Sequence, residues 1–148
     1  MQQLSYWFLV LLLALVACYS QKQKGSKEVE GIDTYTFNKS MLIQGLPAER
    51  FNRVLDSISL VLIDVREPEK YAQKRIKNAI NLNYESLNFA LEISRLDKNK
   101  VYAIYCDNGI RSKLALQKFI DSDIKTVFVL KGGLESFEKK YADKIETK

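Results

Sequence analysis

The chain has 148 residues and a formal net charge of +5, and 47% of its residues are hydrophobic and 28% charged. This composition is typical of an ordinary folded domain and excludes a disordered or fibrous chain. The sequence contains no histidine, which excludes a Cys-His nucleophile pair, a Ser-His-Asp triad and histidine metal sites.

The first segment, MQQLSYWFLVLLLALVAC, carries no charged side chain, and its apolar core runs from Trp7 to Ala17. This core is too short to span a bilayer, which takes about 20 residues, but it suits the apolar part of a secretory signal. The LVA triplet before Cys18 resembles the lipobox of bacterial lipoproteins, which implies cleavage before Cys18 and its acylation. The alternatives are an uncleaved N-terminal helix or a plain signal peptide with an incidental cysteine.

We therefore expect a lipoprotein signal peptide over residues 1–17, a lipidated cysteine and flexible polar tether over 18–32, and a folded domain over 33–148. The stretch YSQKQKGSKEVEGID is polar and lysine-rich and lacks apolar periodicity, as a tether would. Several acyl chains on Cys18 would anchor the protein stably to a membrane. The expected location is the bacterial cell envelope, with the domain facing the periplasm.

Short apolar runs then alternate with amphipathic segments. Branched apolar runs such as Leu60 to Val65 indicate strands that are covered on both faces. The alternation predicts an α/β fold with a parallel sheet and helices on both faces, and ligands of such sheets bind beyond the carboxyl ends of the strands. In chain order we expect a strand at 35–37, a helix at 47–55, a strand at 60–65, a helix at 69–75, a strand at 79–82, a helix at 87–96, a strand at 101–105, a helix at 111–120, a strand at 126–130, a Gly-Gly turn and a helix at 134–142.

Cys106 follows one of these buried strands, and no disulfide partner remains for it if Cys18 is lipidated. Gly109 lies three residues on, just before the expected helix. We expect the backbone between them to form a cup with inward N–H groups at the helix N-terminus, which together with the Arg111 guanidinium would favour a thiolate. Alternatively, Arg111 braces the loop, Ser112 only caps the helix, and Cys106 is simply a small buried apolar residue.

Three segments carry a resemblance to a known family: VLIDVREPEKYAQKRIKNAINL, VYAIYCDNGIRSKLA and VFVLKGGLESF. In this order they resemble the signature segments of single-domain rhodanese-like sulfurtransferases. The resemblance implies a rhodanese-like three-layer domain with a central parallel sheet flanked by helices. It also implies transfer of a sulfane sulfur from a donor, thiosulfate or a persulfide, to a thiol or cyanide acceptor through a persulfide on Cys106, without a metal or another cofactor.

The family's functional residues map onto this sequence one by one. Cys106 matches the nucleophile, and Asp64 and Arg66 match residues that brace loops. Gly132 and Gly133 match a turn beside the active loop. The backbone that would cradle the transferred sulfur, and so bind substrate, comprises Asp107, Asn108, Gly109, Ile110, Arg111 and Ser112.

Several positions depart from the family pattern, and two of them bear on the backbone and on function. Asn78 stands where many relatives have glycine, and asparagine tolerates the left-handed backbone conformation that glycine would adopt. Asp107 places an acidic side chain on the active loop, where it would oppose a dianionic donor such as thiosulfate and favour a persulfide.

The partners expected from this interpretation are a small sulfur donor, a thiol acceptor that could belong to a protein, and the membrane. Scattered lysines without interleaved aromatic residues give no indication of nucleic-acid binding. A second hypothesis is a non-catalytic rhodanese-like binding or redox module at the cell envelope. A third is a phosphatase or arsenate reductase, but only four residues separate Cys106 from Arg111, and those enzymes use a longer loop for a tetrahedral anion.

Overall fold

The computed structural model describes residues 33–34 and 41–148, which belong to one compact unit. The expected signal peptide, Cys18, the tether and the expected strand at 35–37 lie outside the described residues. Within the described ranges, no helix has both the length and the apolar character that a membrane crossing requires.

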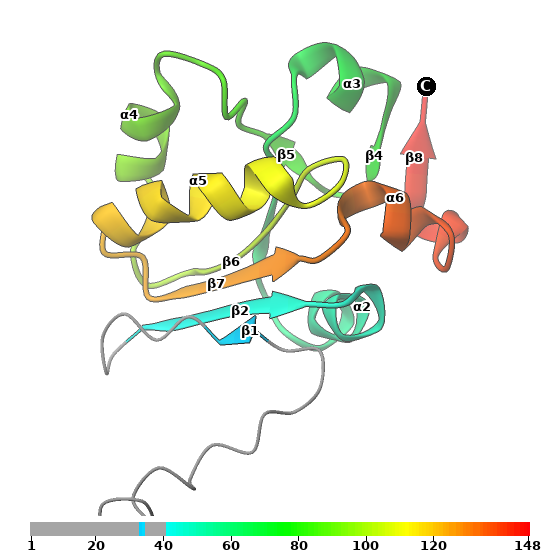
Figure 1. Ribbon diagram of the computed structural model, residues 1–148, viewed down its shortest axis with the longest axis horizontal. Coiled ribbons are helices and arrows are strands. Elements are labelled where there is room, and N and C mark those ends of the chain that lie inside the picture. Colours follow the sequence, from blue (N-terminus) through cyan, green and yellow to red (C-terminus); the bar gives the residue numbers. More distant parts are fainter. Residues whose placement is uncertain (1–32, 35–40) are drawn as a thin grey trace, which may run out of the picture. The chain divides into compact units, whose positions relative to one another are not determined.

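Strands and helices alternate along most of this unit (Figure 1). In chain order the elements are β1 (Asp33–Thr34), β2 (Leu42–Leu46), α2 (Ala48–Ser57), β3 (Val61–Asp64), α3 (Pro68–Gln73), β4 (Lys74–Ile76), β5 (Ile80–Asn81), α4 (Phe89–Ser94), β6 (Val101–Tyr105), α5 (Ile110–Asp121), β7 (Thr126–Leu130), α6 (Gly133–Glu138), a 3₁₀ turn (Ala142–Lys144) and β8 (Ile145–Thr147).

The central sheet of the described part has the strand order β1-β2-β7-β6-β3-β5. The five strands from β2 to β5 in this order pair in parallel, and β1 is antiparallel to β2. The predicted α/β class with a parallel central sheet is therefore confirmed. A separate antiparallel pair is formed by β4 and β8.

Two apolar cores lie on opposite faces of the sheet, because successive side chains of a strand point to opposite faces. In β6, Tyr102 and Ile104 join a core with side chains of α4 and α5, whereas Ala103 and Tyr105 join a core with side chains of α2 and α6. The helices α4 and α5 therefore cover one face and α2 and α6 the other, and Figure 1 shows α5 running along β6 and β7. This gives the predicted three layers, and each fully buried large apolar side chain stabilises them by about 1.5–3 kcal/mol.

Several elements differ from the sequence-based expectation, and β1 and β8 are among those not predicted. The strand Leu42–Leu46 was not predicted, because Gln44 and Gly45 interrupt its apolar run. The helix expected to reach residue 75 ends at Gln73, and β4 follows at once because it pairs with β8, with Arg75 opposite Glu146. The last helix ends at Glu138 instead of reaching residue 142, and the chain turns there into the segment that leads to β8.

Candidate active site

Cys106 lies at the carboxyl edge of the central sheet, directly after β6. The parallel register places Tyr105, the last residue of β6, opposite Asp64, the last residue of β3. The sheet therefore brings together the two segments that sequence analysis singled out. Cys106 has no exposed surface.

The loop after Cys106 turns backbone amides toward its sulfur. The N–H groups of Gly109 and Ser112 donate to Sγ, with nitrogen-to-sulfur distances of 3.2 and 3.4 Å. Gly109 adopts φ +90°, a left-handed conformation that favours glycine, and directly precedes α5. The predicted cup at a helix N-terminus is therefore present, and it provides the environment that stabilises negative charge on sulfur.

Ser112 lies inside α5 and does not cap it, because the helix begins two residues earlier at Ile110. Its hydroxyl donates to the carbonyl of Gly109 at 3.1 Å and lies 3.6 Å from the sulfur of Cys106. The hydroxyl thus lines the sulfur pocket. The expectation that Ser112 only caps the helix is wrong.

Asn108 and Ile110 form the outer part of the loop. The side-chain carbonyl of Asn108 accepts a hydrogen bond from the N–H of Ile110 at 3.1 Å, which fixes the turn into α5. The side chain of Ile110 is exposed. Behind this part of the loop lies a largely apolar groove of about 900 Å³ whose walls include Asn108, Gly109 and Ile110 but not Cys106. The groove is therefore distinct from the pocket of amides around the sulfur.

The double glycine packs directly against the loop. Gly132 and Gly133 have φ values of +71° and +59°, and α6 starts there. The first amides of α6 hold loop carbonyls: Leu134 N–H donates to the carbonyl of Cys106 at 2.8 Å, and Glu135 N–H donates to that of Asp107 at 3.0 Å. These two bonds hold the loop carbonyls to the start of α6. The predicted place of this turn beside the loop is confirmed.

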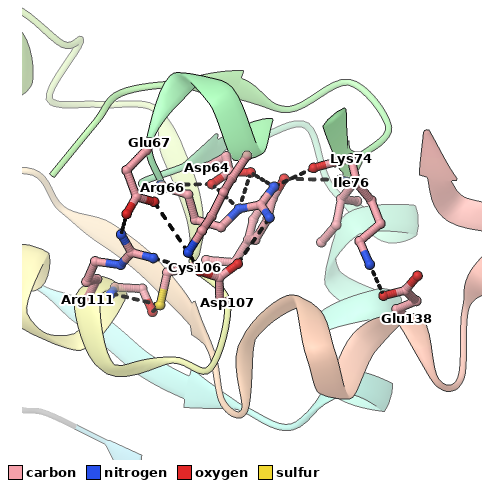
Figure 2. Close-up of polar contacts among 12 residues, drawn as sticks. Asp64, Arg66, Glu67, Lys74, Ile76, Cys106, Asp107, Arg111 and Glu138 are labelled. Atoms are coloured by element: carbon pink, nitrogen blue, oxygen red, sulfur yellow. Dashed lines mark hydrogen bonds and ion pairs between the residues drawn. The ribbon is translucent and has the colours of Figure 1, made fainter. Parts of the chain in front are cut away.

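Asp64 and Arg66 form a buried ion pair beneath the loop (Figure 2). The Arg66 Nη2 lies 2.6 Å from Asp64 Oδ2, and the two side chains are 3% and 0% exposed. Burial acts to lower the pKa of Arg66, but the hydrogen bond and the charge of Asp64 outweigh it and raise that pKa above its ordinary value. Arg66 also donates through Nη1 to Asp107 Oδ1 at 3.1 Å. The pair therefore braces the loop, as expected.

Asp107 is the point at which the cations of the site converge. Its carboxylate lies 3.1 Å from Arg66, 2.9 Å from Lys70 and 2.7 Å from Arg111. Burial acts to raise the pKa of Asp107, but hydrogen bonds from Lys70 and Arg66 and their charges hold it below its ordinary value. Asp107 is therefore ionised at neutral pH and ties α3 and α5 to the loop.

Arg111 braces the loop through carboxylates on both sides. Its Nη1 lies 2.6 Å from Glu67 Oε1 and 3.5 Å from Glu85, and its Nη2 lies 2.7 Å from Asp107. The hydrogen bond from Arg111 lowers the pKa of Glu67 below its ordinary value. Of the two roles considered for Arg111, these contacts match bracing of the loop, and Figure 2 shows the ion pairs of its guanidinium with Glu67 and Asp107.

Sequence analysis missed Glu67, Lys70 and Glu85 as members of this site. Glu67 directly follows Arg66 in DVREPEK and Lys70 lies four residues after it, and such mixed charges normally form a solvated surface. The available signal was their position just past the end of a buried strand, since that is the edge at which ligands bind in α/β sheets. Asn78, the other departure, adopts φ +66°, as expected.

Most of the domain is similar to known proteins. The family model described as "Rhodanese-like domain" matches residues 47–140. Solved structures with the same fold include the Rhodanese-like domain from an Anabaena sp. protein, with a TM-score of 0.59, 22% identity and coverage of 69% of this chain and 77% of that one. A Rhodanese-like domain protein from Staphylococcus aureus has a TM-score of 0.58, 23% identity and coverage of 70% and 97%.

The curated relatives are longer proteins. The tRNA uridine(34) hydroxylase of Photorhabdus laumondii is 30% identical over 115 residues, which is 75% of this chain and 33% of that protein. The enzyme of the same name from Yersinia enterocolitica is 29% identical over the same length. This chain thus spans about a third of the length of these relatives.

Proposed function

Because the chain belongs to the rhodanese-like domain family, we propose that it is a sulfurtransferase that carries a sulfane sulfur as a persulfide on Cys106. The observation that supports this most strongly is the pair of backbone amides, from Gly109 and Ser112, that donate to Sγ at 3.2 and 3.4 Å. A thiolate is stabilised by such donors at a helix N-terminus, so no histidine base is needed.

The proposed reaction has two steps. In the first, the Cys106 thiolate attacks the outer sulfur of a donor R–S–SH, an S–S bond forms, the donor S–S bond breaks and RS⁻ leaves. In the second, an acceptor thiolate R′S⁻ attacks the outer sulfur of the Cys106 persulfide, which gives R′S–SH and regenerates the thiolate. With thiosulfate as donor the leaving group is sulfite, and with cyanide as acceptor the product is thiocyanate. Because Cys106 has no exposed surface, a donor must displace the side chains that cover it.

The names of the curated relatives suggest a second candidate, a role in tRNA uridine hydroxylation. The match covers only about a third of those proteins, so most of each relative lies outside the region that aligns with this chain. Specific binding of tRNA by this protein would favour the second candidate.

A third candidate is a non-catalytic binding or redox module. This candidate would be favoured if a Cys106→Ala strain kept the wild-type phenotype while deletion of the whole domain changed it.

The experiment for the sulfurtransferase proposal is sulfur uptake followed by mass spectrometry. The full chain is incubated with thiosulfate or a persulfide, and the peptide that contains Cys106 is analysed. One added sulfur atom on Cys106 is expected in the wild type and in Cys18→Ser, and none in Cys106→Ser. Uptake on Cys18 alone would contradict the proposal.

The N-terminal segment supports a further part of the proposed function, namely anchoring at the bacterial cell envelope through acylated Cys18. The support is the apolar core that ends in LVAC. Cells that express the chain should incorporate labelled fatty acid into the wild type and not into Cys18→Ser. Equal labelling of both proteins would exclude this anchor.

A further inference from the structure

We propose that Glu67 and Asp107 make this site select sulfur donors of low charge, organic persulfides, over dianionic donors such as thiosulfate. This inference rests on the proposed sulfurtransferase function and specifies its substrate class. It is carried by the ion pairs around the sulfur pocket (Figure 2).

The ion-pair network to which Arg111 and Asp107 belong carries no excess of positive charge. The cations Arg66, Lys70 and Arg111 pair with the carboxylates of Asp64, Glu67, Glu85 and Asp107. Three positive charges thus face four negative ones. An incoming dianion would add two further negative charges to a cluster that already has a formal excess of one.

Arg111 is the cation that would have to receive a dianionic donor, because it lies in the first turn of α5, directly before Ser112, whose amide donates to the sulfur. Both of its terminal nitrogens already contact carboxylates, Nη1 at 2.6 Å from Glu67 and Nη2 at 2.7 Å from Asp107. The Arg111 side chain is 18% exposed, so these contacts are only partly screened by water. Thiosulfate must therefore compete with two fixed carboxylates for one guanidinium.

A persulfide avoids this competition. An organic persulfide carries at most one negative charge on its S–S group, and its outer sulfur is neutral in the R–S–SH form that the thiolate attacks. The amides of Gly109 and Ser112 that donate to Sγ offer donors for one sulfur atom. The transfer forms the Cys106 Sγ–S bond, breaks the donor S–S bond and releases RS⁻, so no oxidant or reductant is consumed. The loop thus offers amide donors to the transferred sulfur of a persulfide, and this does not require a cation to be released from its carboxylate partners.

The test compares two donors of different charge. Full-length protein is mixed with thiosulfate or with 2-hydroxyethyl persulfide, and the second-order rate of sulfur uptake on Cys106 is followed by mass spectrometry after rapid alkylation. The variants are Glu67→Gln and Asp107→Asn, which keep the size of the side chain and one acceptor oxygen but remove the charge. Glu49→Gln is the matched control, since Glu49 pairs with Lys140 away from the site.

We expect the ratio of the thiosulfate rate to the persulfide rate to rise about tenfold in each site variant, which corresponds to about 1.4 kcal/mol of transition-state free energy. The ratio in Glu49→Gln should equal that of the wild type. An unchanged ratio in both site variants would overturn the inference. Absence of sulfur on Cys106 with either donor would instead refute the sulfurtransferase function itself.

Ionic strength provides a second measurement that needs no variant. If local carboxylates repel the dianion, added inert salt screens them and the wild-type ratio rises. If the excess positive charge of the chain attracts thiosulfate, the ratio falls with salt. A fall of the wild-type rate ratio with added salt would contradict the inference, and this result would hold even if the site variants did not fold.

Discussion

The backbone carbonyl of Cys106 accepts a hydrogen bond from the N–H of Leu134, with a nitrogen-to-oxygen distance of 2.8 Å. This bond links the candidate nucleophile to the first turn of α6. The neighbouring bond from Glu135 N–H to Asp107 has the same effect one residue later. The shape of the sulfur pocket therefore depends on the Gly132-Gly133 turn as much as on the loop itself.

Gly133→Ala should disrupt this contact. A Cβ at this position would lie 2.2 Å from the carbonyl oxygen of Asp107 and 2.5 Å from that of Cys106, with φ at +59°. We expect a loss of about 3–5 kcal/mol in the free energy of unfolding, measured by urea denaturation, because the loop backbone must move and the left-handed conformation is strained.

Gly132→Ala is the matched control for this substitution. Its φ is also positive, at +71°, but the added Cβ would meet Oγ and Cβ of Ser136, at 2.8 and 2.9 Å, and no backbone atom of the Cys106 loop. The expected loss is about 1–2 kcal/mol for the backbone conformation, plus a small shift of Ser136, and is smaller than that of Gly133→Ala. Equal losses in the two variants would show that the contact with the loop is not what requires glycine at 133.

Sequence patterns predicted the parts of this site that depend on local structure. The apolar run before Cys106 ends as a strand at the expected residue, and Gly109 adopts the left-handed conformation that its position required. The helix after the loop extends from Ile110 to Asp121, one residue beyond the predicted range at each end. These features follow from periodicity and from the conformational freedom of glycine.

Contacts between distant segments could not be predicted in the same way. Glu67 meets Arg111 only because β3 and β6 are neighbours in the sheet, and the order of strands is not encoded in any single segment. The strand β4 was likewise missed, since its partner β8 lies at the far end of the chain. Short polar strands of this kind lack the alternation from which a strand is predicted.

Arg66→Met should destabilise the domain strongly. The substitution leaves the Asp64 carboxylate, which is 0% exposed, without the cation that now lies 2.6 Å away. Removal of one partner of a buried pair typically costs about 3–5 kcal/mol. Thermal or urea denaturation of the variant measures this loss.

Lys98→Met provides the comparison for that variant. Lys98 pairs with Asp123 at 3.7 Å, and the two side chains are 54% and 74% exposed. An exposed pair contributes about 0–1 kcal/mol. If both substitutions cost the same, burial does not make the Asp64–Arg66 pair important for stability.

The stability of the domain should fall in acid because of Asp107 and Glu67. Both carboxyl pKa values are held below their ordinary values of 3.8 and 4.5 in the folded state, so the unfolded chain binds protons first as pH falls. Their contribution is fully present above about pH 5 and is lost as pH falls through the lowered folded-state values. Urea denaturation between pH 7 and pH 2 measures this decline.

Asp107→Asn isolates one part of that decline. The variant should be less stable than the wild type at pH 7 by about 1 kcal/mol, allowing for solvent screening, because the ion pairs with Arg66, Lys70 and Arg111 are lost. The two proteins should converge as pH falls through the lowered pKa of Asp107 and the wild-type carboxylate becomes protonated. A difference that stays constant with pH would indicate that the charge of Asp107 contributes nothing.

The most direct test of the whole account is the mass of the Cys106 peptide after the full chain has met a 2-hydroxyethyl persulfide donor and then a thiol acceptor. We predict one added sulfur atom on Cys106 after the donor and its loss after the acceptor, with an equal amount of acceptor persulfide formed. A Cys106 thiol that gains no sulfur, in protein shown to be folded, would contradict the account.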